Sequence, residues 1–121
     1  MFPATFATLK VNSGVTALFG SNPCRIYPHG EAPQGVTLPY ATQQLVGGLP
    51  ENYLGDLSDM DGARVQFDVY ATTAAGARAG AAAIRVALEG IGYVVSFNTD
   101  GRDPDTNNAR YSFDMGFYTA R

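Results

Sequence analysis

Hydrophobic and polar residues alternate most regularly over residues 63–71. Val65, Phe67 and Val69 are separated by polar side chains, and this period of two predicts a strand with one buried face. The same period of two returns over residues 110–118. Here the side chains on one face are large and apolar: Tyr111, Phe113, Met115 and Phe117. The other face of each strand is polar, so the sequence predicts a sheet with one apolar and one polar side.

A helical period separates these two strands. Apolar residues recur at spacings of four, three and four residues: Ala77, Ala81, Ile84 and Leu88. This stripe predicts a helix that starts at Thr72 or Thr73 and ends near Glu89, with Gly90 as the stop. Its many alanines, with Gly76 and Gly80, allow close approach of a neighbouring backbone, which is either the sheet of the same chain or another subunit.

The N-terminal segment predicts two short helices. Pro3 suits a first helical turn, and apolar residues at positions 2, 6 and 9 share a face, which predicts a helix over residues 3–11. Residues 12–14 interrupt it. Ser13 is the expected cap of a second helix that ends at Gly20.

The remaining segments predict strands and loops. Four prolines in residues 22–39 predict a loop with a restricted backbone path and a short extended segment at 25–27. Strands are expected at 40–46 and 93–97, a turn at 47–50, and polar loops at 51–62 and 98–108. The order α, α, β, β, β, α, β, β predicts one α+β domain over residues 1–121, with a mainly antiparallel sheet of four to five strands and helices packed on one face.

Charge limits the classes of function. The net charge is −3 and the basic residues are scattered, which argues against binding nucleic acid through its phosphates. Charged residues are 16% of the chain, below the ~25% of typical soluble domains, so we expect partners to cover part of the surface. No apolar run approaches the ~18 residues of a membrane span, and the N-terminus lacks the pattern of a signal peptide. We expect that the protein is made in the cytosol and does not associate with a membrane.

Catalytic chemistry has few candidates in this chain. Cys24 is the single cysteine and His29 the single histidine, so a nucleophile and base would have to be this pair. We interpret Cys24 as a small hydrophobe and His29 as a surface residue. The run Asp59-x-Asp61-Gly62 lacks the further oxygen ligands of a calcium loop. The sequence therefore predicts no catalytic residue, no cofactor and no metal site.

Several short motifs, taken in their order and spacing, resemble a known family. They are Arg25-Ile26-Tyr27-Pro28, the following Ala32-Pro33-Gln34-Gly35-Val36 and Leu38-Pro39-Tyr40, the strand Ala63–Ala71, the alanine-rich helix, and the Arg-x-x-x-Asp-x-x-Phe of Arg110 to Phe117. Together they cover essentially the whole chain. The chain resembles the tail completion, or tail terminator, proteins of long-tailed phages and prophages.

This resemblance implies a structural role in the virion at the junction of tail and neck, after assembly in the host cytoplasm. It implies a homo-oligomeric ring of six copies that caps the head-proximal end of the tail tube, stops its polymerisation and joins the head connector. DNA would pass through the lumen without specific binding. The alternatives are another neck component, either a head–tail connector or a stopper, and a small ligand-binding or hydrolytic domain that uses Cys24 and His29.

Two groups of residues are candidates for contacts in such a ring. The polar faces of the two clearest strands are candidates for the subunit interface: Arg64, Gln66, Asp68, Tyr70, Arg110, Asp114 and Tyr118. Acidic residues of the two polar loops are candidates for lining the lumen, where they would repel phosphates, or for contacting partners: Asp56, Asp59, Asp61, Asp100, Asp103 and Asp105.

Overall fold

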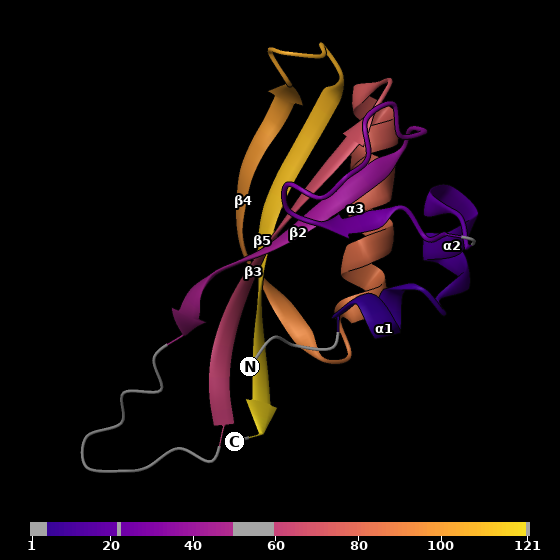
Figure 1. Cartoon of the computed structure of the whole chain (residues 1–121). Coiled ribbons are helices and arrows are strands. Elements are labelled where there is room, and N and C mark those ends of the chain that lie inside the picture. Colours follow the sequence, from indigo (N-terminus) through magenta and orange to yellow (C-terminus); the bar gives the residue numbers. More distant parts are fainter. Residues whose placement is uncertain (1–4, 22, 50–59, 121) are drawn as a thin grey trace.

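The computed structural model describes residues 5–21, 23–49 and 60–120. Three helices and five strands follow one another along the chain (Figure 1). The order is α1 (Thr5–Leu9), α2 (Ser13–Phe19), β1 (Ile26–Pro28), β2 (Tyr40–Leu49), β3 (Met60–Ala71), α3 (Ala74–Leu88), β4 (Gly92–Arg102) and β5 (Ala109–Ala120).

The strands form one sheet in the order β1-β2-β3-β5-β4. Short β1 runs parallel to β2, and every other pair is antiparallel. The three helices lie on the same side of this sheet, with α3 across β3, β5 and β4 (Figure 1). This arrangement confirms the predicted α+β fold with a mainly antiparallel sheet and helices on one face.

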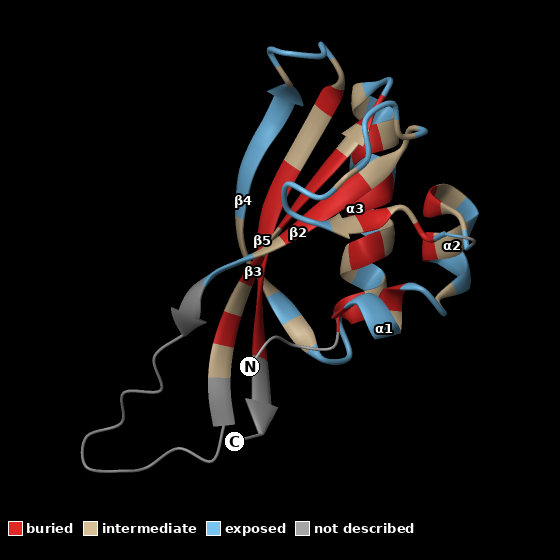
Figure 2. Ribbon diagram, in the orientation of Figure 1, coloured by how far each residue is buried: buried red, intermediate tan, exposed pale blue. Residues whose placement is uncertain are grey.

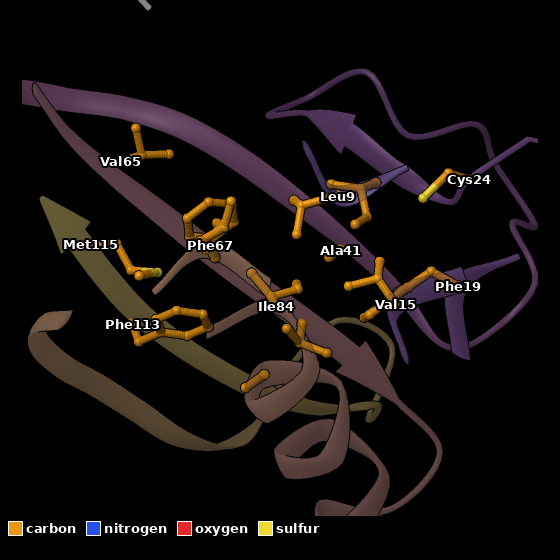
Figure 3. Packing of buried hydrophobic residues seen from close by; sticks show 14 of the residues in the cluster. Leu9, Val15, Phe19, Cys24, Ala41, Val65, Phe67, Ile84, Phe113 and Met115 are labelled. Atoms are coloured by element: carbon orange, nitrogen blue, oxygen red, sulfur yellow. The ribbon is translucent and has the colours of Figure 1, made fainter. Parts of the chain in front are cut away.

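The core lies between α3 and the apolar face of the sheet (Figure 3). Phe67 of β3 and Phe113 of β5 stack with their ring centroids 5.4 Å apart, and Ile84 of α3 is buried near them. Full burial of each such side chain stabilises the fold by about 1.5–3 kcal/mol. The alternation correctly identified residues of the core, since Val65, Phe67, Val69, Phe113, Met115 and Phe117 are all buried. Figure 2 shows the buried stretches of β3 and β5.

Small residues let α3 lie close to the sheet and to α2. A Cβ atom on Gly80 would come within 2.8 Å of Val69 Cγ1 and 2.9 Å of Phe19 Cζ. Ala77, Gly80 and Ala81 are all buried, so the sheet and α2 of the same chain account for the small residues on this side of the helix.

The first N-terminal helix ends earlier than predicted, and the cap of the second is one residue earlier. α1 covers Thr5–Leu9 of the expected 3–11. Asn12, not Ser13, caps α2: its side-chain oxygen accepts a hydrogen bond from Val15 N at 3.1 Å. Ser13 is instead the first helical residue. Gly20 ends α2 as expected, with a positive φ of 83° and its N–H donated to Thr16.

The strands extend further than predicted. β4 continues through the expected polar loop to Arg102, and the turn is confined to 103–108. β2 continues through Gly47 and Gly48 to Leu49, with a register shift after Leu45. In both places pairing with a neighbouring strand supplies the backbone hydrogen bonds and overrides low strand propensity. Of the predicted loop 51–62, Met60 to Gly62 belong to β3, and the rest lies outside the described residues.

Candidate protein-contact face

The side of the sheet opposite the helices carries a continuous set of polar side chains, here called the polar face. The strand register brings these residues together from four strands. They are Tyr40, Thr42 and Gln44 of β2, Arg64, Gln66, Asp68 and Tyr70 of β3, Arg110, Ser112 and Asp114 of β5, and Ser96 and Asn98 of β4. All three helices lie on the other side, so no described helix covers this face (Figure 1).

Asp114 is the centre of one half of the polar face. Its side chain is only 7% exposed, and its two oxygens accept hydrogen bonds from Arg64 Nε and Asn98 Nδ2, each at 2.7 Å. Arg64 also donates to Ser96 Oγ at 3.1 Å, and Ser96 donates to Asn98 Oδ1 at 2.8 Å. A buried carboxylate needs such donors, because it would otherwise lose its hydration without compensation.

Asp68 is the centre of the other half. Its side chain is 3% exposed and accepts hydrogen bonds from Arg110 Nη2 and from Gln66 Nε2, all at 3.2 Å. Both arginine side chains are about one third exposed, so each covers its carboxylate and is itself partly accessible. A partner would thus contact arginine and amide side chains, while the two carboxylates lie beneath them.

Several buried polar atoms of this face have no hydrogen-bond partner within the described residues. They are Thr42 Oγ1, Ser112 Oγ and Arg110 Nε. An unpaired buried polar group costs roughly 1–3 kcal/mol, so native proteins rarely leave several together. Three such atoms on one face show that its hydrogen bonding is incomplete among the described residues.

Two tyrosines of the polar face stack on each other. The rings of Tyr40 and Tyr70 lie 4.8 Å apart with an interplanar angle of 18°. Burial, and next the negative charge of Asp103, raises the pKa of Tyr40. Burial, followed by the charge of Asp68, also raises the pKa of Tyr70. Both hydroxyls therefore stay protonated and can donate hydrogen bonds to a partner.

The predicted interface residues mostly meet on this face. The structure brings together six of them: Arg64, Gln66, Asp68, Tyr70, Arg110 and Asp114. Tyr118 pairs with Gly62 through the backbone of β5, and its side chain lies outside the description. Whether another copy binds here stays a prediction.

Sequence reasoning missed the contributions of β2 and β4. Tyr40, Thr42 and Gln44 share one face of the strand that was expected at 40–46, so alternation was available as a signal. Gln43 obscured it, because this polar residue points to the helix side, where the hydroxyl of Thr5 donates to its side chain. Ser96 and Asn98 gave no signal, since bulges near both residues break the alternation of β4.

The acidic candidates have different surroundings. Asp56 and Asp59 lie outside the described residues, and so does the side chain of Asp61, whose backbone belongs to β3. Asp103 and Asp105 lie in the β4–β5 turn. Asp103 accepts hydrogen bonds from Thr106 Oγ1 at 2.9 Å and from the backbone N–H of Asp105 at 3.4 Å, which is ordinary turn chemistry.

Asp100 is not a loop residue, contrary to the prediction. It lies in β4 on the helix side of the sheet, opposite Tyr111, and forms an ion pair with Arg78 of α3 at 2.7 Å. Together they close one side of a shallow cleft of about 230 Å³ between α3 and β4, here called the α3–β4 cleft. Its other walls are Arg85, Phe97, Tyr111, Phe113 and two alanines of α3.

The Cys24 and His29 pair has the wrong environment for nucleophilic chemistry. Cys24 is 5% exposed within the core, and burial raises the pKa of its thiol, which disfavours the reactive thiolate. His29 is exposed. Within the described ranges, no three His, Cys, Asp or Glu residues are grouped to hold a metal ion. Among the described helices none is long and apolar enough to cross a membrane.

Comparison with known proteins relates this chain to one family and to a solved structure of similar fold. The family described as Tail completion protein gp17 matches residues 3–120. A chain from a structure titled "Virion of native gene transfer agent (GTA) particle" has a similar fold, with a TM-score of 0.63 and 20% sequence identity. The similarity covers 98% of this chain and 92% of that one. No curated protein matches the sequence.

Proposed function

Because the chain belongs to the Tail completion protein gp17 family and is thus a structural protein of phage tails, we propose that it is a tail terminator. Six copies form a ring on the head-proximal end of the tail tube. The ring stops tube polymerisation and provides the surface to which the head connector binds. This role places the protein in the virion, at the junction of tail and neck, without catalytic activity.

The observation that supports this proposal is the polar face. A solvated sheet face would expose its carboxylates, whereas here Asp68 and Asp114 lie under two arginines. Beside them, the hydroxyls of Thr42 and Ser112 and the Nε of Arg110 are buried and have no hydrogen-bond partner in the described part of the chain. Arginine and tyrosine side chains are also the types that contribute most to interface energy. We assign this face to the contact between neighbouring copies.

A ring contact of this kind joins two different surfaces, because each copy meets one neighbour on either side and the contact repeats around the axis. The polar face would supply one surface. The exposed side of α3, where Ala75 and Ala79 are small enough for close approach, is a candidate for the other.

The acidic turn residues fit a passage for DNA. Asp105 is exposed and Asp103 partly so at the end of the β4–β5 hairpin. If this turn faces the lumen, its negative charge would repel phosphates and prevent DNA from adhering. The comparison chain comes from a structure titled as a virion particle, which agrees with a proposed location in the virion.

Native mass measurement of the purified protein tests the ring. We expect a species with the mass of six 12.8 kDa chains, and a Gln44→Arg variant with a bulky cation on the polar face should shift it to the monomer. The control is Thr72→Arg, which places the same side chain at an exposed position before α3. A wild-type protein that is monomeric and does not cap tubes would refute the terminator. A Gln44→Arg ring as stable as the control would remove the polar face from the interface.

A further inference from the structure

We propose that the α3–β4 cleft binds an extended segment of a different tail or neck protein, through one large apolar side chain and a carboxylate two residues along. This inference rests on the proposed function, since it takes the ring as given and names the chemistry of a partner outside it. The cleft lies on the helix side of the sheet, away from the polar face.

The apolar part of the cleft is an exposed aromatic surface. Phe97 is 59% exposed although it lies on the core side of β4, opposite Phe113. Its ring meets Tyr111 edge to face, with centroids 6.3 Å apart. The cleft volume of about 230 Å³ is below the ~300–1,000 Å³ of small-molecule pockets. A single anchoring side chain of a protein partner suits this size better than a metabolite.

The charged part of the cleft has one arginine available. Arg78 is paired with Asp100 at 2.7 Å, whereas the Arg85 side chain is 41% exposed and its Nε has no hydrogen-bond partner among the described residues. The carboxylate of Glu89 lies 3.8 Å from Arg85 Nε, beyond hydrogen-bond length. A partner carboxylate could bind Arg85 directly. Asp100 and Glu89 would repel a phosphate with two charges, so a group with one negative charge is favoured.

The edge of the sheet defines how the partner lies. β4 is an edge strand, and its last four residues, Thr99–Arg102, pair with β5 in regular register. Their exposure is visible at the end of β4 in Figure 2. A segment added along these residues places every second side chain on the helix side, where Asp100 lies. The register shifts before Thr99 limit the added ladder to a short stretch.

The described part of this chain offers no segment of the required kind, which favours a different protein. Leu45 and Val46 are exposed on β2 but have no described carboxylate beside them. Glu89 and Ile91 are exposed in the tight turn after α3, where Ile91 N donates to Leu88 O. Asp100 is held by Arg78.

Nuclear magnetic resonance of the full chain tests the cleft with a defined probe. The probe is a capped seven-residue peptide, Ser-Thr-Leu-Thr-Asp-Thr-Ser, titrated to millimolar concentration. We expect shifts confined to α3 around Arg85 and to residues 97–102. A peptide with Asn in place of Asp should bind on the order of 10-fold more weakly, because a charged hydrogen bond to Arg85 is lost. A peptide with Ser in place of Leu should show no shifts.

Matched protein variants complete the test. Arg85→Met should bind the Asp peptide about as weakly as wild type binds the Asn peptide, whereas Lys10→Met, with the same change of charge, should bind normally. Phe97→Ser should abolish the shifts, whereas Val86→Ser, at a 62% exposed position on α3, should retain them. Equal binding of the Asp and Asn peptides, or no shifts in the cleft, would overturn the proposal.

Two further results separate the occupants and the two proposals. Cleft signals that move with protein concentration in the absence of peptide would assign the cleft to a second copy and overturn the partner proposed here. The native mass of the same samples shows independently whether the ring has formed. A monomer that binds the peptide would refute the ring and support the cleft as a binding site. A ring that does not bind the peptide would support the ring and refute the cleft as a binding site.

Discussion

Asp114 joins three strands through its two oxygens. Arg64 of β3 and Asn98 of β4 each donate to it at 2.7 Å, and its own strand β5 lies between them. These hydrogen bonds are charge-assisted and partly removed from water, so they contribute more than fully exposed surface pairs.

Replacing this carboxylate should therefore lower stability. We expect Asp114→Asn to reduce the free energy of unfolding by about 1–3 kcal/mol, because Arg64 loses its charge partner in a mostly buried position. Urea unfolding followed by circular dichroism measures this change. The matched variant Asp105→Asn, on an exposed turn, should stay within about 0.5 kcal/mol of wild type. An equally small effect of Asp114→Asn would mean that water compensates the lost charge.

At the residue scale, the sequence identified most of the polar face but not its burial. Alternation placed Arg64, Asp68 and Asp114 on the polar side correctly. That the two carboxylates are nearly inaccessible depends on side chains from neighbouring strands, such as Arg110 and Asn98, whose pairing partners are set by the fold. Asp100 was misplaced for the same reason, since pairing with β5 decided its conformation.

At the scale of elements, α3 is held close to the sheet by the absence of a side chain. Gly80 faces Val69 and Phe19, both fully buried, and each would be less than 3 Å from an added Cβ. The helical period predicted α3 almost to the residue, from its cap at Thr73 to its end at Leu88, because an amphipathic stripe and a cap are local signals.

A methyl group at Gly80 should destabilise the protein although alanine is the better helix former. We expect Gly80→Ala to lower the free energy of unfolding by about 1–2 kcal/mol, since overpacking costs more than the ~1 kcal/mol of helix propensity gained. Thermal and urea unfolding measure this difference. Gly76→Ala is the comparison, because its nearest contacts are 3.2 and 3.3 Å away, and it should be the less harmful substitution. The reverse order would show that α3 can shift freely.

The strand boundaries were harder to predict than the helix for a physical reason. β4 ends in Asn98-Thr99-Asp100-Gly101-Arg102, a composition typical of turns, yet it pairs with β5 as far as Arg102. Strand hydrogen bonds come from distant segments, so local composition underestimates a strand whose neighbour is long. The bulges in β2 and β4 were equally invisible to a period-two pattern.

At the scale of the whole molecule, loss of the protein should have two effects at once. In particles that lack it, we expect heads and tails that stay separate, and tails of uncontrolled length, because the proposed terminator would both end the tube and provide the joining surface. Electron microscopy of lysates measures both. Free tails of normal length would instead favour a head–tail connector or stopper. Restoration by the intact gene, but not by a Gln44→Arg copy, would link the phenotype to the polar face.

The fold class and the family could be predicted from the chain because both depend on the order of elements and short motifs. The α3–β4 cleft could not. Its arginines are on one helix, and Phe97 is on an edge strand whose register is set by bulges, so only the folded structure brings them together.

The burial of Cys24 makes the protein convenient to label. Maleimide reagents react with thiolates in contact with solvent, and the single native thiol is 5% exposed with a raised pKa. A cysteine introduced at an exposed site such as Thr72 would therefore carry a fluorophore or spin label selectively, with the native sequence otherwise unchanged. With one dye on each copy, the number of photobleaching steps gives the number of subunits in a single assembled particle.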